Sequence, residues 1–152
     1  MAVDIDSILA QVTSHAQTLG VFERFNGAEP ENAPGNGLTG ACWVQDIGPD
    51  RTGSGLASTS MVLLLNVRLY LPVNNLAPET LDPRMVKALD LLFAAYIGDF
   101  TLGGLVRMVD VRGAKGNPLS GRAGYQQLDE VVHRVFTITL PLVVNDVWVE
   151  AS

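Results

Sequence analysis

The sequence predicts an α+β protein: a mostly antiparallel sheet of four to six strands with two helices packed on one face. Apolar residues recur every three or four positions in 3–19 and again after 82, which is typical of amphipathic helices. They alternate with a period of two through 58–71 and fill the segment after 131, which indicates strands. The chain has 152 residues, of which 47% are hydrophobic, enough for one domain with a sizeable core.

The first half is expected to hold one helix and two long strands. Residues 3–19 form the helix, with Asp4 or Asp6 as N-cap and Gly20 as the stop. Strands follow at about 40–47 and 58–71, joined by the flexible connection Gly48–Gly55. We expect residues 48–57 to protrude as an extended loop.

The second half begins with a helix signal at Asp82-Pro83, an N-cap followed by proline at the first helical position. This helix is expected to bury Val86 and Tyr96 and to end at Gly98. Strands are predicted at 105–111 and 125–128, on either side of a loop over 112–124. A turn at 129–130 then leads into the last strand.

That last strand contains the run VFTITLPLVVNDVW, with Pro141 in its middle. Proline cannot donate to a ladder, so the strand must lie at an edge, bend, or change partners there. We expect residues up to Leu140 to belong to the subunit's own sheet. The segment from Leu142 to Trp148 is predicted to continue towards a neighbour, with Trp148 as its anchor.

Charge is scarce. Only 17% of residues are charged, against about 25% in an average globular protein. We therefore expect partners to cover part of the surface. The net charge of −6 argues against broad binding to a phosphate backbone. Because the first residues are acidic and no apolar run reaches 18 residues, the chain is predicted to be cytosolic when made, without a membrane anchor.

The residue pattern nominates no catalytic chemistry, cofactor or metal. His15 and His133 have no ligand-type neighbour at metal-site spacing. A partly buried structural role is favoured for His15, and a position on the sheet surface is favoured for His133 over a role as general base. Cys42 lies in an apolar run and is interpreted as a buried core thiol. No nucleotide-binding or hydrolase motif is present, and Asp99 and Asp110 alone do not indicate acid–base chemistry.

Basic residues gather in the loop 112–124, which holds Arg112, Lys115 and Arg122. One interpretation is a positive arm that contacts an acidic partner subunit or passing DNA, and the other is a solvated loop. Thirteen residues without regular structure are uncommon in a compact domain unless they serve a function. The sequence leaves both interpretations open.

Four strings resemble tail proteins of siphophages that infect actinobacteria, and the best fit is the tail terminator, or tail-completion, family. The strings are APGNGL (33–38), SGLASTS (54–60), GDFTLGG (98–104) and TITLPLVVNDVW (137–148). The resemblance covers most of the chain and implies one terminator-like domain over 1–152. It also implies a hexameric ring on the head-proximal end of the tail tube, which stops tube growth.

The resemblance further implies that the tail-tube protein and a head–tail connector or stopper protein are partners, and that DNA passes through a central channel without sequence-specific binding. The ring would be part of the virion and would be assembled in the host cytoplasm. Such a role uses surfaces and no catalytic residues. A net negative subunit would let DNA slide, a hypothesis that a continuous pore lining of the loop's basic residues would contradict. The candidate contact residues are Asp50, Arg51, Arg112, Lys115, Arg122, Leu142, Val144 and Trp148.

Two neighbouring functions remain alternatives: another junction component, such as a head-closure or stopper protein, and a tail-tube subunit. The alternative from a different class is a small cytosolic α+β enzyme or ligand-binding dimer. It would need a concave pocket with converging polar groups. The sequence nominates no such pocket.

Overall fold

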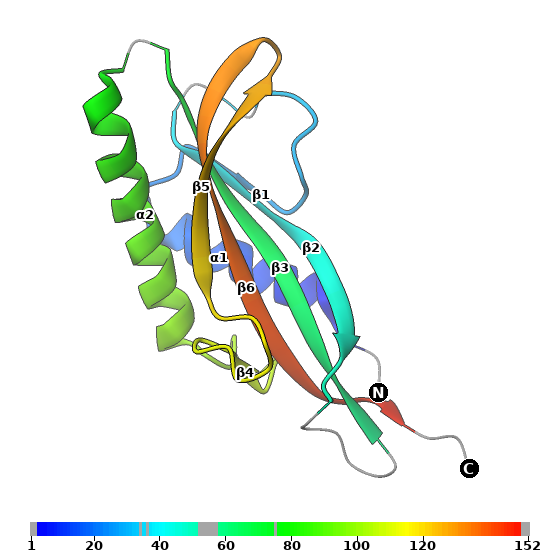
Figure 1. Cartoon of the computed structure of the whole chain (residues 1–152). Helices are drawn as coiled ribbons and strands as arrows, with labels where there is room; N and C mark the ends of the chain where they lie inside the picture. Colours follow the sequence, from blue (N-terminus) through cyan, green and yellow to red (C-terminus); the bar gives the residue numbers. More distant parts are fainter. Residues whose placement is uncertain (1–2, 34, 36, 52–57, 75, 150–152) are drawn as a thin grey trace.

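A computed structural model of the chain describes residues 3–33, 35, 37–51, 58–74 and 76–149. Within these ranges two helices, α1 and α2, accompany six strands (Figure 1). In chain order the elements are α1 (Ile5–Thr18), β1 (Arg24–Asn26), β2 (Thr39–Pro49), β3 (Ser58–Pro72), α2 (Pro78–Gly98), β4 (Met108–Val109), β5 (Ser120–Leu128) and β6 (Val131–Val149).

The strands form a single curled sheet in the order β1-β2-β3-β6-β4, and β5 also pairs with β6. All pairings are antiparallel except that of β1 with β2. The expected fold class, α+β with a mostly antiparallel sheet, is confirmed. Figure 1 shows that β2, β3 and β6 form a long ribbon whose lower end reaches beyond both helices.

The main core lies between the helices and one face of the sheet. On that face, β3 residues of odd number stand beside the even-numbered residues of β6, for example Leu65 beside Leu140 and Leu63 beside Leu142. All four of these side chains are at most 1% exposed. The two-residue alternation seen in the sequence therefore builds the core face, as expected.

Helix α1 begins with the expected N-cap, because the Asp4 carboxylate accepts a hydrogen bond from Ser7 N at 3.2 Å. Hydrogen bonding from the Ser7 side chain, and then from its backbone N–H, holds the pKa of Asp4 below its ordinary value. The buried Tyr96 hydroxyl donates to Val12 O at 3.2 Å and joins the two helices. Cys42 is fully buried beside Thr13 of α1, and burial raises the pKa of its thiol.

Helix α2 starts five residues before the predicted position, at Pro78 instead of Pro83, with Ala77 in place of Asp82 as the N-cap residue. Two proline signals compete in this segment, and the first one sets the start because Pro78 takes the first helical turn. Asp82 does not cap the helix; its carboxylate accepts two bonds from Arg134 of β6, at 2.8 and 3.2 Å. Tyr96 is buried as expected, but Val86 is 48% exposed.

The predicted loop 112–124 is shorter in the structure, because residues 120–124 belong to β5. Strand β5 and β6 form a hairpin whose turn, Asp129-Glu130, has positive φ at both residues (49° and 65°), the geometry of a two-residue hairpin turn. The strand predicted at 105–111 is reduced to β4, two residues long. Of the predicted loop 48–57, positions 52–57 lie outside the described residues, and 48–49 are part of β2.

Pro141 lies where β6 changes its outer partner. Strand β5 pairs with β6 as far as Thr139, and β4 begins at Leu142. The Pro141 carbonyl accepts from Asp110 N at 2.9 Å on the β4 side. Because N–H and C=O of one strand residue point the same way, the missing donor faces this junction and not β3. Of the three alternatives that the sequence left open at Pro141, an edge, a bend or a change of partner, the structure shows a change of the outer partner.

The expectation that β6 leaves the sheet after Leu140 is wrong. Residues from Leu142 to Val149 continue to pair with β3, as far as Ser58 opposite Val149. Leu142 has no exposed surface. The strand stays with its sheet because β3, 15 residues long and apolar, supplies a partner along this half, apart from a bulge at residues 145–147.

Candidate assembly surface

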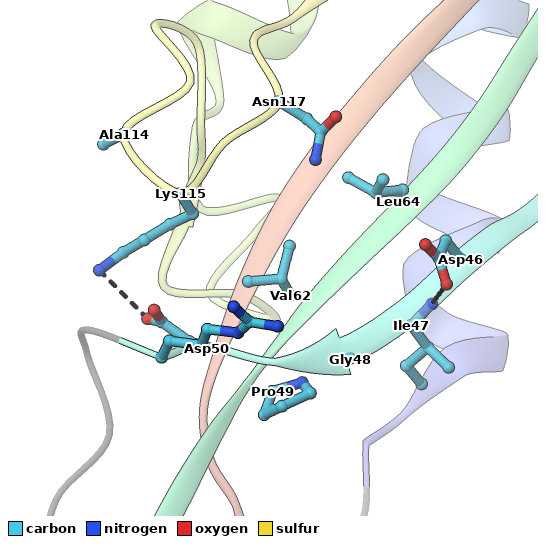
Figure 2. Close-up of a pocket in the computed structure, with 11 residues that line it drawn as sticks. Asp46, Ile47, Gly48, Pro49, Asp50, Val62, Leu64, Ala114, Lys115 and Asn117 are labelled. Carbon is cyan, nitrogen blue, oxygen red and sulfur yellow. Dashed lines mark hydrogen bonds and ion pairs between the residues drawn. The ribbon is translucent and has the colours of Figure 1, made fainter.

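The face of the sheet turned away from the helices carries a hollow of about 460 Å³ near the lower end of the ribbon (Figure 2). Its floor is apolar and comes from Val62 and Leu64 of β3. Its walls come from two segments, the end of β2 with Asp50 and Arg51, and the loop around Lys115. Segments about sixty residues apart in the chain therefore meet here.

The loop around Lys115 is held by a single carboxylate. Asp110 is 3% exposed, and its two oxygens accept from Ala114 N and Lys115 N, each at 2.8 Å. Gly113 is needed in this turn: its φ is +76°, and a Cβ there would lie 2.8 Å from Pro118 N. The loop thus has a defined shape that aims Lys115 across the hollow.

Lys115 and Asp50 bridge the two walls. The Lys115 ammonium lies 3.2 Å from the Asp50 carboxylate, and the two side chains are only 15% and 1% exposed (Figure 2). Two of the sequence-predicted contact residues are therefore bound to each other within the subunit. A partly buried ion pair of this kind costs desolvation, and its main effect is to fix the loop against the sheet.

A second hollow, of about 600 Å³, continues along the same face and is lined by polar side chains, among them Asn66, Thr139 and Arg122. Arg68 in its floor is engaged: Nε donates to Thr137 Oγ1 at 2.8 Å, and the guanidinium lies 5.2 Å from the centre of the Trp43 ring. Arg122 is exposed on β5 and forms no salt bridge within the described residues.

The remaining predicted contact residues are dispersed. Arg112 is exposed on the loop, and it does not line either of the two hollows. On β6, Leu142 belongs to the core and Val144 is half-buried, whereas Trp148 is 44% exposed opposite Thr59. Trp148 is thus the one member of the predicted C-terminal contact that presents a large apolar surface.

The lower end of the ribbon is shaped by a bulge in β6. Asp146 has φ of +50°, and its N–H donates to Ser60 Oγ at 3.1 Å while its carboxylate accepts from Ser58 Oγ at 2.6 Å. The bulge turns the strand so that Val147 is buried and its neighbours Trp148 and Val149 are exposed.

The two histidines have structural surroundings. His15 is half-buried, as expected, and its Nε2 lies 2.8 Å from Asp99 Oδ2. A bond from Gly103 N, with others from His15 and Gln11, holds the pKa of Asp99 below its ordinary value. His133 was expected on the sheet surface, but it is fully buried and packs edge-on against Tyr70. The expectation is wrong because Tyr70 and Val135 form a second apolar cluster on that face.

Sequence reasoning missed Asp110 as the centre of the loop and Arg68 as the polar floor of the second hollow. Asp110 carried a usable signal, since Asp before a Gly-containing segment often bonds to following backbone amides. Across the described residues there is no group of three or more His, Cys, Asp or Glu side chains arranged to hold a metal ion. No helix in those ranges is long and apolar enough to cross a membrane.

Comparison with known proteins gives distant likeness to solved structures only. No protein-family model matches the chain, and no curated protein matches its sequence. Among solved structures, the chain is similar to the sheath/tube terminator of an extracellular contractile injection system, PVC, in its extended state. The TM-score is 0.48 with 10% sequence identity, and the match covers 100% of this chain. The chain spans 61% of the length of that protein.

Proposed function

We propose that this chain is a structural virion protein, a tail terminator that forms a ring on the head-proximal end of the tail tube. The observation that carries the proposal is the lower end of the ribbon, where β2, β3 and β6 reach beyond the helices (Figure 1). Apolar side chains are exposed towards the ends of these strands: Ile47 of β2 is 51% exposed, and Trp148 and Val149 of β6 are 44% and 62% exposed. An apolar tip on a stiff ribbon suits a protein–protein contact.

The remaining parts of the proposal follow from the resemblance of the sequence strings to the terminator family. The ring is a homohexamer that stops tube growth, meets the tail-tube protein on one side and a connector or stopper protein on the other, and leaves a central DNA channel. The whole chain serves as one domain, and it contributes no catalytic or cofactor chemistry. The ring belongs to the virion tail and is assembled in the host cytoplasm.

The test is electron microscopy of the purified protein mixed with tail tubes of the phage that encodes it, with mass photometry of the protein alone. We expect rings seated on tube ends. Trp148→Ser should abolish capping. Val132→Ser is the matched control, because Val132 is also an exposed apolar residue of β6, 39% exposed, at the opposite end of the strand. A protein that remains a compact dimer and ignores tubes would contradict the proposal.

A tail-tube subunit is the second candidate. It is favoured by the strand edges that, among the described residues, have no partner on either side of the sheet, since such edges would also serve lateral contacts in a polymer. Tube subunits stack into long polymers on their own, whereas a terminator stops at one ring or stays monomeric. Electron microscopy of the protein alone at high concentration separates these two functions.

A further inference from the structure

The sheet has two open edges on opposite sides. Strand β1 pairs with β2 only at residues Thr39–Ala41, so the outer side of β2 from 42 to 49 has no strand partner among the described residues. Strand β5 pairs with β6 on one side and likewise has no described strand on the other. An open strand edge is a template for another strand.

The hydrogen-bonding groups that face outward can be assigned from the pairing. The two-residue turn makes Leu128 and Val131 a hydrogen-bonded pair, so alternation turns the backbone groups of 121, 123, 125 and 127 away from β6. Just before β2, Leu38 O accepts a hydrogen bond from Glu23 N at 2.8 Å on the β1 side. Because backbone groups alternate along the strand, the N–H and C=O groups of residues 42 and 44 also point to that side, away from β3. Ile47 N–H bonds to the adjacent Asp46 carboxylate at 2.8 Å.

The side chains of the outward-facing residues lie on the helix side of the sheet at both edges. Cys42 contacts α1, and a Cβ at Gly121 would meet Leu89 of α2. On this side apolar surface is exposed at Val44 (41%) and Tyr125 (66%), and the Arg134 guanidinium lies 4.5 Å from the centre of the Tyr125 ring. Neither 42–48 nor β5 contains Lys or Pro, residues that commonly block edges.

The opposite side of each edge carries one charge, and the two charges have opposite sign. Asp46 stands beside Leu64 on the helix-free face of β2, and Arg122 stands beside Thr137 on the same face of β5. Within one subunit, β3 and β6 separate these strands by about 14 Å, three strand spacings. The two side chains form no salt bridge with each other in the structure.

Strand directions allow the edges to meet between copies. Each of the pairings β2–β3, β3–β6 and β6–β5 is antiparallel, so β5 runs opposite to β2. Copies related by rotation about an axis along the strands would therefore bring β5 of one copy antiparallel to β2 of the next. The two edges differ, so the contact is heterologous and can close into a ring.

We infer that copies of this chain join edge to edge, with β5 of one subunit pairing to residues 42–48 of the next and Arg122 facing Asp46 of that neighbour. This register brings Ala123 and Tyr125 alongside Val44 on the helix side, so charge meets charge and apolar surface meets apolar surface. Closure of the contacts into a ring rests on the proposed function, whereas the edge contact itself does not.

The test is a disulfide placed across the contact. In a Cys42→Ala background, the double variant Asp46→Cys/Arg122→Cys is oxidised and run on a non-reducing gel. We expect a ladder of multimers, because every subunit offers both halves of the bond. The matched control is Asp46→Cys/Gln127→Cys, which uses the same strands with side chains on opposite faces, and it should yield no ladder. Each single variant should yield no species larger than a dimer.

A charge exchange gives an independent measurement on the assembled protein. Asp46→Arg or Arg122→Asp alone should raise the dissociation constant of self-association about three- to tenfold, because like charges then face each other. The double exchange should restore it. Circular dichroism checks that each variant is folded.

The outcomes separate this contact from the proposed function. Rings on tube ends without a cysteine ladder would overturn the edge contact and leave the terminator in place. A ladder in a protein that ignores tubes would support the contact and contradict the terminator. A protein that stays monomeric at every concentration, with tubes present, would overturn both.

Discussion

The two halves of β6 share a strand and an inner partner but have different outer neighbours. From Val131 to Thr139 the outer side is closed by β5, a regular strand of nine residues. At Leu142 and Val143 it is covered by two-residue β4, which leads into the loop that Asp110 holds. Both halves place fully buried apolar side chains beside β3, for example Leu140 in the first and Leu142 in the second. A strand segment thus belongs to the core because it buries side chains beside its inner partner, here β3, and regular pairing on its outer side is not required.

The largest expected effect comes from removing the second half. Truncation after Pro141 deletes Leu142, Val143 and Val147, which are at most 7% exposed, together with the partner of the lower part of β3. We expect loss of cooperative unfolding in a circular dichroism melt. Truncation after Val147 is the control and should still unfold cooperatively. A folded protein ending at Pro141 would show that the second half is an arm.

Single core truncations compare the halves directly. Leu140 and Leu142 are both fully buried on the core face, one on each side of Pro141. Replacing either with Ala should lower the free energy of unfolding by about 2–5 kcal/mol, measured in urea. Trp148→Ala should cost less, because that side chain is 44% exposed. If Leu142→Ala lowers the free energy of unfolding less than Trp148→Ala does, the second half of β6 is not part of the core in the way the first half is.

The loop that closes the second half depends on one carboxylate. Asp110→Ala leaves Ala114 N and Lys115 N without their acceptor and should cost about 1–3 kcal/mol. Asp110→Asn keeps one acceptor oxygen and should cost less. Proteolysis should become faster between 111 and 118 in the Ala variant. If both variants melt like the parent protein, the loop is held by other contacts.

Much of the fold could be predicted from the sequence because local patterns determine it. Alternation identified β3 and the core face of β6, and the helical spacing located α1 with its Asp4 cap. The edge strand β5 was only half found. Its polar, glycine-containing first half resembles a loop, and it is a strand because β6 offers it a ladder.

The candidate surface was less predictable, because long-range pairing decides which residues are free. The sequence could not show that Lys115 would bind Asp50, or that β3 would extend far enough to keep Leu142 inside. It also could not show that Asp46 and Arg122 stand on one face of opposite edges, since that depends on the strand order. Trp148, near the end of β6, could be nominated from the sequence because an aromatic residue beyond the apolar run stands out without any pairing information; it is 44% exposed, and its role as a contact stays a prediction.

The smallest expected effect concerns the residue that divides the two halves. Pro141→Ala adds an N–H that faces the junction between β5 and β4, and it raises the conformational entropy of the unfolded chain. The free energy of unfolding should therefore fall by less than about 1 kcal/mol. Thr139→Pro is the contrasting change, because Thr139 pairs with Ser120 of β5 and alternation points its N–H towards that strand.

Removing the ladder donor at Thr139 should cost about 1–3 kcal/mol and expose β5 amides to hydrogen exchange. Amide exchange in the second half should change little, because β4 and the Asp110 loop begin beyond the break. If Pro141→Ala instead destabilises the protein as much as Thr139→Pro does, the proline itself positions the two outer partners. The junction would then be a rigid hinge between the halves of β6.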